Sequence, residues 1–238
     1  IGMTVDEAMA ALKTIYPDFK IMFRRLPLGE TTDNDPIIGL AATYTTGPKQ
    51  VVAEMFDETI YLAFSAPPRS PVVIAIHRWR STPLAPMSNA QILDALRSKY
   101  GKETIALGTQ RYWFFNEKHN RIPPPKIAMD TSCHPARAQF GIQEISQYVI
   151  WLYNNFSSGY TESQIEDFTR IRPSCGTTVV LDGVGKDNEL STDFNMWIID
   201  YPAYDHAIRE GATYYAGKQK AREIEQLEKA KKSGGPRM

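Results

Sequence analysis

The chain has 238 residues, of which 42% are hydrophobic and 23% are charged. This length corresponds to one large domain or two small ones, and the composition is typical of a soluble globular protein. The 27 basic residues balance 27 acidic residues, so the formal net charge is zero. Because proteins that neutralise nucleic-acid phosphates usually carry a basic excess, nucleic acid is disfavoured as a partner. No apolar run approaches about 18 residues, so we expect no transmembrane segment.

The first predicted element is a capped helix at residues 4–16. Thr4 is followed three positions later by Glu7, which is the spacing of a capping box. Apolar side chains recur behind it at helical spacing, and Pro17 ends the pattern because the residue before a proline is pushed out of the α region. The same spacing predicts two more helices: residues 88–100, with Ser88, Gln91 and a closing Gly101, and residues 161–171, with Thr161 and Gln164.

Segments of alternating or β-rich character follow the first helix and predict strands. They occupy residues 19–24, 37–45, 51–56, 59–65 and 72–79, and in the first of them Ile21 and Phe23 are expected on the buried side. Because antiparallel neighbours need only short turns, this succession predicts a meander. Later strands are predicted at residues 112–115, 178–181 and 194–199, the last two joined by a turn from Gly183 to Asn188.

A succession of strands without long helices between them predicts an α+β fold, with antiparallel sheets and helices packed on one face. Pro123, Pro124 and Pro125 form a stiff, extended run that marks the best internal boundary. We therefore divide the chain into possible modules at residues 1–122 and 126–202, followed by a charged helix and tail at residues 203–238.

The last helix, predicted at residues 203–232, presents only about one apolar side chain per turn. Its stripe consists of Ala221, Ile224, Leu227 and Ala230. A stripe this narrow is too little to hold a helix on a core, so we expect the helix to project from about Gly217 onward. Ile224 and Leu227 are therefore candidate binding residues.

Arg78, Trp79 and Arg80 form a second candidate binding surface. At strand spacing, the two arginines share one face of a sheet and the tryptophan takes the other. This arrangement suits a solvated face over a core tryptophan, or a cationic surface for an anion or a carbohydrate.

No cluster in the sequence has the spacing of a known catalytic motif or metal site, so we assign no catalytic residue, metal or cofactor. Asp130, Cys133 and His134 lie close together, but adjacent residues on an extended chain point in opposite directions.

Two further clusters admit plain structural interpretations. Asp200, Asp205 and His206 could offer metal ligands, but a helix cap at Asp205 with His206 in the first turn fits better. The run from Gly183 to Lys186 lacks the spacing of a phosphate-binding loop and suits a turn between strands.

The opening Gly2-Met3-Thr4-Val5-Asp6-Glu7-Ala8 resembles the start of small exported lipoprotein modules of the SmpA/BamE type. Residues 62–78 and 96–101 are similar to segments of bacterial exported proteins. The resemblance covers about the first hundred residues. It implies a capped helix followed by a short antiparallel sheet, a location in the cell envelope, and a binding or scaffolding role, and it supplies no catalytic residues.

The chain has two cysteines, Cys133 and Cys175, neither of them in a C-x-x-C motif. In an exported protein they would form one disulfide, whereas in a reducing cytosol they would be two thiols. The lipoprotein-like opening and the start at Ile1 instead of Met both indicate export, so we expect the disulfide.

The leading functional hypothesis is an exported, periplasmic cell-envelope protein that binds a protein partner or a surface polymer without catalysis. One alternative is a hydrolase whose carboxylate and histidine groups are assembled only by the fold. Such an enzyme should show converging acidic groups, or an acid and a histidine, in a pocket. A toxin inhibitor or immunity-type protein is the other alternative, and it would resemble a binding module.

Overall fold

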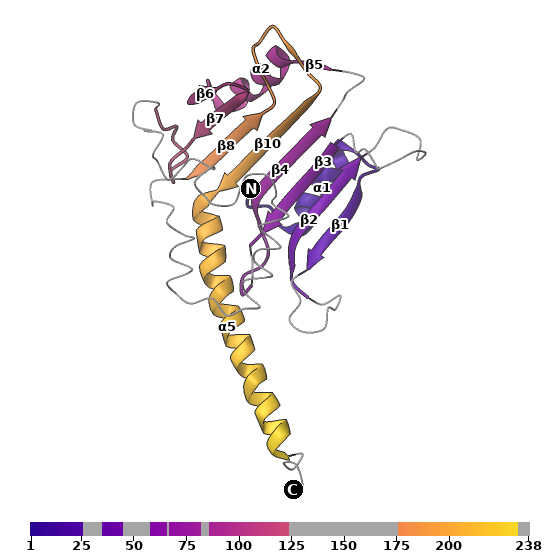
Figure 1. The fold of residues 1–238 in the computed structure, drawn as a ribbon, viewed down its shortest axis with the longest axis vertical. Coiled ribbons are helices and arrows are strands. Elements are labelled where there is room, and N and C mark those ends of the chain that lie inside the picture. The colour runs from indigo at the N-terminus through magenta and orange to yellow at the C-terminus, as the bar shows by residue number, and fades with distance from the viewer. Residues whose placement is uncertain (26–34, 45–57, 66, 82–85, 124–175, 233–238) are drawn as a thin grey trace.

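The described part of the chain folds around one long antiparallel sheet (Figure 1). A computed structural model describes residues 1–25, 35–44, 58–65, 67–81, 86–123 and 176–232. Helix α1 (Val5–Ile15) and helix α2 (Asn89–Tyr100) accompany the sheet, and the long helix α5 (Tyr201–Lys232) extends from one end of it. The predicted α+β class is therefore confirmed.

The large sheet has eight strands in the order β1-β2-β3-β4-β10-β8-β7-β6, and every neighbouring pair is antiparallel. Strands β1 to β4 form the predicted meander. Their bounds, and those of the remaining strands, are β1 (Lys20–Arg25), β2 (Ile37–Tyr44), β3 (Glu58–Phe64), β4 (Val73–Ser81), β6 (Ile105–Leu107), β7 (Gln110–Phe114), β8 (Thr177–Asp182) and β10 (Asp193–Asp200). A small second sheet pairs β5 (Met87–Ser88) with β9 (Leu190–Ser191).

Strands from both sides of the proline run lie in the same sheet. Strand β10 pairs with β4 on one side and with β8 on the other, and β8 pairs with β7. The described residues of the two predicted modules are therefore joined by backbone hydrogen bonds. Residues 124–175 lie outside the described residues, as do the strand predicted at 51–56 and the helix predicted at 161–171.

The capping box predicted for the first helix is present. The Thr4 hydroxyl accepts from the Glu7 backbone N–H at 3.3 Å, and Glu7 Oε2 accepts from the Thr4 backbone N–H at 2.8 Å. Two N–H groups that the helix itself cannot satisfy thus find acceptors.

The capping box predicted at Ser88 is wrong. Ser88 directly precedes α2, but its side chain makes no capping hydrogen bond. Its backbone instead pairs with Leu190 in the small sheet, and the Asn89 N–H donates to the Glu189 carbonyl at 3.1 Å. The strand contact therefore satisfies the first N–H of the helix, whereas a side-chain cap at Ser88 would have accepted from a later N–H of the first turn. The predicted glycine at the other end is confirmed, since Gly101 has a φ of 77°.

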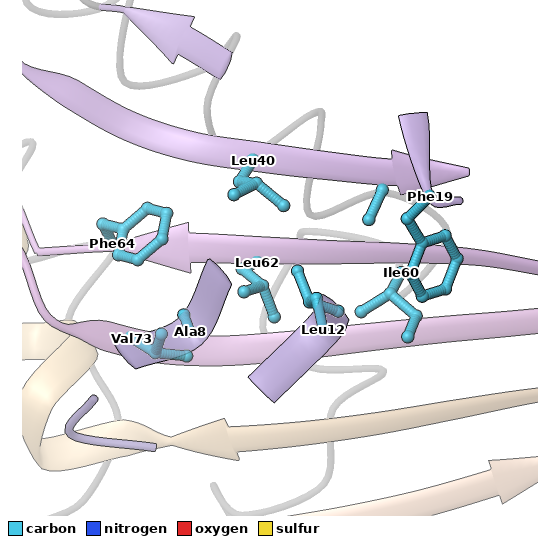
Figure 2. Packing of buried hydrophobic residues seen from close by; sticks show 9 residues of the cluster. Ala8, Leu12, Phe19, Leu40, Ile60, Leu62, Phe64 and Val73 are labelled. Atoms are coloured by element: carbon cyan, nitrogen blue, oxygen red, sulfur yellow. The ribbon is translucent and has the colours of Figure 1, made fainter. Parts of the chain in front are cut away.

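Helices α1 and α2 pack on the same face of the sheet, as predicted. Ala8 and Leu12 of α1 lie over a cluster that includes Leu40, Leu62 and Phe64 (Figure 2). Leu93 of α2 packs on a second cluster, formed with Trp113, Val179, Leu181, Val184 and Phe194. The strand register links the two, because Leu62 lies opposite Ile76, Ile76 opposite Ile198, and Ile198 opposite Val179.

Strand β1 forms one edge of the sheet, and its burial departs from the predicted alternation. Ile21 packs against the cluster under α1, but Phe23 is 38% exposed and Met22 is 49% exposed. An edge strand has a neighbour on one side only, so its apolar side chains receive less cover than those of β2 and β3.

Arg97 joins the end of α2 to two other segments. Its guanidinium donates to both carboxylate oxygens of Glu103, at 2.8 Å and 3.0 Å, and to Asp187 before β9 at 3.0 Å. The hydrogen bonds from Arg97 hold the pKa of Glu103 down to about 2, from an ordinary value of 4.5. The Glu103 side chain is only 9% exposed, so it depends on this pairing.

We predict that Arg97→Gln lowers the free energy of unfolding by about 2 kcal/mol at neutral pH, because it leaves the Glu103 carboxylate without its charged partner. A depressed folded-state pKa stabilises the protein above the unfolded value of 4.5, and the benefit is lost as pH falls toward 2. The difference between wild type and variant should therefore shrink over that interval in urea titrations.

Asp94→Asn is the matched control, because Asp94 lies 3.9 Å from Arg97 and is 75% exposed. It should change the free energy of unfolding much less. If the loss of unfolding free energy on Arg97→Gln stayed constant from about pH 6 to about pH 2.5, the Arg97–Glu103 pair would not be its source.

Candidate functional site

The structure places Arg78 and Arg80 on the helix-bearing face of the sheet and Trp79 on the opposite face. Ile76, two positions before Arg78, packs against the cluster under α1, and strand alternation carries the same orientation to both arginines. Both arginines are half-exposed. Trp79 is also half-exposed, so it is not the core residue that the strand pattern favoured.

Arg78 is paired with a buried carboxylate. Its Nε lies 2.5 Å from Glu58 Oε1, and the Glu58 side chain is 1% exposed. Removing a carboxylate from water is costly unless a cation and hydrogen bonds compensate it. Arg78 therefore has a structural role, which is to compensate the buried charge of Glu58, and that role limits its availability to a ligand.

Two tyrosines complete this arginine–tyrosine cluster, which we define as Tyr16, Tyr44, Glu58, Arg78 and Arg80. The rings of Tyr16 and Tyr44 stack with centroids 4.4 Å apart. Burial raises the pKa of Tyr16, and the negative charge of Glu58 adds to that shift, while Arg80 opposes it. The cluster thus combines two guanidinium groups with one carboxylate beside two aromatic rings. Such a surface suits contact with an anionic or an aromatic ligand.

We predict that Arg78→Met destabilises the protein by about 3 kcal/mol, because it leaves Glu58 buried and unpaired. The double variant Glu58→Leu/Arg78→Met should recover part of this loss, since it removes both charges. Chemical denaturation of the three proteins provides the measurement.

Arg80→Met is the matched control, since it removes the same type of side chain from the same face without unpairing Glu58. It should cost clearly less than Arg78→Met. Equal losses for the two single variants would show that the Arg78–Glu58 pair is not the source of the stability.

A buried histidine lies on the opposite face and was not singled out by its sequence context. His77 is 5% exposed and is stacked between Tyr61, at 5.6 Å, and Trp197, at 4.9 Å. Its Nε2 lies 3.0 Å from the side-chain amide oxygen of Asn195. The pairing of β4 with β10 brings these residues together from positions more than a hundred residues apart, so only the long-range register could have revealed them.

The same face carries an aromatic cluster that anchors the start of α5. Tyr201, the first residue of α5, packs with Tyr112, Phe114, Val180 and Trp197. Tyr201 is 2% exposed, and burial raises the pKa of its hydroxyl. The first turn of α5 is therefore part of the core.

Asp200, Asp205 and His206 do not form a metal site. Asp200 Oδ1 accepts from the Ala203 N–H at 3.2 Å and so caps α5. Asp205 pairs with Arg209 inside the helix, and His206 lies 3.5 Å from Glu210. The expectation that Asp205 is the cap is wrong, because the helix begins at Tyr201. Among the described residues, no group of histidine, cysteine and acidic side chains could hold a metal ion.

The far end of α5 is solvated. Gly217, Lys218 and residues 220–232 are exposed, with Ile224 at 50% and Leu227 at 61%. An ion pair between Arg69 and Glu210, 2.9 Å long, ties the earlier part of the helix to the turn before β4. Figure 1 shows the rest of α5 extending away from the sheet, as we expected from its narrow apolar stripe.

The two sets of candidate binding residues lie far apart. Arg78 and Arg80 are opposite Met196 and Phe194, near the start of β10, whereas α5 begins after the end of that strand. The arginine–tyrosine cluster and the exposed end of α5 are therefore separate surfaces. Asp130, Cys133, His134 and Cys175 lie outside the described residues.

Comparisons with protein-family models, with curated proteins and with solved structures give no match for this chain. Among the described helices, none is both long and apolar enough to cross a membrane.

Proposed function

We propose that this chain is an exported cell-envelope protein that binds a protein partner through the projecting end of α5, without catalysis. The observation that carries this proposal is the exposure of Ile224 and Leu227 on a helix whose residues 220–232 are all exposed. Apolar side chains three positions apart on one side of a helix are the anchors by which a helix docks in a groove of a partner.

The geometry of α5 favours a protein as the partner. The helix is anchored at its start by the buried Tyr201 and continues unbroken to Lys232, so its exposed end extends beyond the sheet as part of one helix. Ile224 and Leu227 lie three positions apart, on the same side of the helix. Such a pair fits between the side chains of a second helix.

One described contact bears on the hydrolase alternative. The buried carboxylate of Glu58 is paired with Arg78, whereas a general base needs a carboxylate that can take up a proton at the reacting atom.

Location in the envelope rests on the resemblance of residues 2–8 to exported lipoprotein modules, and it carries a chemical consequence. We predict that Cys133 and Cys175 form one disulfide in protein exported to an oxidising compartment. Mass spectrometry after thiol alkylation should show two added groups only when the sample is first reduced. Two alkylated thiols in unreduced, freshly isolated protein would contradict export and favour a reducing compartment.

We predict that Ile224→Gln/Leu227→Gln weakens partner binding by about tenfold to a hundredfold, since it removes the apolar area of two side chains from the contact. Glutamine preserves charge and helix propensity. The measurement is capture of the partner from envelope extract by the 238-residue chain, quantified against wild type.

The matched control is Glu225→Gln/Lys229→Gln, which removes an ion pair on another side of the same turns, where Lys229 Nζ lies 2.7 Å from Glu225 Oε1. This variant should bind as wild type does, and all proteins should show the same thermal unfolding. Capture that is equally strong for the apolar variant would refute a docking role for α5.

A further inference from the structure

The outer side of strand β1 is an open sheet edge that carries charge of one sign. β1 pairs with β2, and among the described residues no strand lies on its other side (Figure 1). We propose that this edge is a second binding site, separate from α5, which accepts an extended acidic segment of another protein as an additional strand. In such strand addition, main-chain hydrogen bonds provide affinity and alternate side chains provide specificity.

The backbone of β1 has hydrogen-bonding groups that its own sheet does not use. In an antiparallel pair, alternate residues direct their N–H and C=O groups toward the neighbouring strand, and the residues between them direct theirs outward. The ladder with β2 is regular from Lys20 to Arg24, and the register shifts between Arg24 and Arg25. The five residues from Lys20 to Arg24 are therefore in position to pair with an added strand.

The apolar side chains of this edge are exposed on both faces of the sheet. Ile21 packs under α1, so strand alternation places Phe23 on the helix-bearing face and Met22 on the opposite face. Phe23 is 38% exposed and Met22 is 49% exposed. Cross-strand neighbours on an added strand would cover both side chains, which the edge alone leaves in water.

Every charged residue of β1 is basic, namely Lys20, Arg24 and Arg25. Within the described part of the chain none of them forms an ion pair, and Arg25 donates to the main-chain carbonyl of Asp35 at 2.8 Å. By alternation, Lys20 and Arg24 flank Met22 on one face. This basic–apolar–basic row reads the same from either end. A segment with an acidic residue on each side of an apolar one therefore matches it in either direction.

The same charges disfavour a second copy of this chain as the added strand. Two β1 strands side by side would bring together the three basic side chains of each copy, and no register supplies an acidic residue, because β1 contains none. The nearest acidic residue in sequence, Asp18, lies in the turn before the strand. Basic side chains commonly protect a sheet edge from pairing with its own kind, and they favour a strand of the opposite charge.

The test uses the 238-residue chain and a labelled, acetylated peptide, Thr-Glu-Val-Leu-Val-Glu-Thr, whose glutamates flank leucine on one face when it is extended. Fluorescence anisotropy gives the dissociation constant. We expect Lys20→Glu/Arg24→Glu to weaken binding by about tenfold or more, because two opposite-charge cross-strand pairs become like-charge pairs. A peptide with lysine in place of both glutamates should bind this variant more tightly than it binds wild type, which also shows that the variant still presents the edge.

Lys102→Glu/Lys118→Glu is the matched control, because it makes the same change of charge elsewhere. Both lysines are exposed, and they lie beside β6 and after β7, at the opposite end of the strand order. This variant should bind the acidic peptide as wild type does.

N-methylation of the peptide separates strand addition from charge attraction. One version is methylated at its odd-numbered residues and another at its even-numbered residues, and both keep the two glutamates. Only alternate N–H groups of an added strand point toward β1, so one version should lose binding and the other should retain it. Equal effects of the two versions, whether binding is kept or lost in both, would overturn the inference.

Three further results would also overturn it. The first is binding of the lysine peptide to wild type as tight as that of the acidic peptide, and the second is no binding of the acidic peptide at all. The third is a wild-type dimer in sedimentation equilibrium that Met22→Lys dissociates, which would identify a second copy as the added strand. None of these results bears on the docking role proposed for α5, which is tested through Ile224 and Leu227.

Discussion

The pairing of β10 with β4 and β8 is the interaction on which the rest of the structure depends. It joins a meander formed by the first part of the chain to strands that follow more than ninety residues beyond β4. Each residue of β10 from Asn195 to Ile199 lies opposite one residue of β4 and one of β8. Loop closure over such a separation costs entropy, which the hydrogen bonds of both ladders and the burial of Phe194 and Trp197 must offset.

The register of β10 also decides what each face of the sheet carries. A shift by one residue would exchange Ile198, which faces the helices, with Trp197, which stacks on His77. The same register sets where Tyr201 enters the aromatic cluster, and thus where α5 leaves the sheet. The clusters under α1 and α2, the buried histidine and the exit of α5 are therefore consequences of one alignment.

Local signals predicted the local structure well. The Thr4–Glu7 box, the strands of the meander, Gly101 and the narrow stripe of α5 each depend on neighbours within a few positions, where spacing determines contact. Ser88 shows where local prediction fails. It has the same capping-box spacing, but its backbone pairs with Leu190 in the small sheet, and a contact over about a hundred residues cannot be read from local spacing. The Arg78–Glu58 pair and the stacking of His77 depend equally on which strands are adjacent. The sequence indicated that Arg78 and Arg80 share a face of the sheet, but it could not indicate that Arg78 is paired with a buried carboxylate.

Helix α5 follows β10 without a connecting loop, since the strand ends at Asp200 and the helix begins at Tyr201. A pull on the far end of α5 is therefore transmitted directly into the backbone of β10. Because β10 is an interior strand with a ladder on each side, a force along its length loads many hydrogen bonds in shear at the same time, whereas an edge strand would be peeled away one bond at a time. The two ladders of β10 would therefore resist such a pull together.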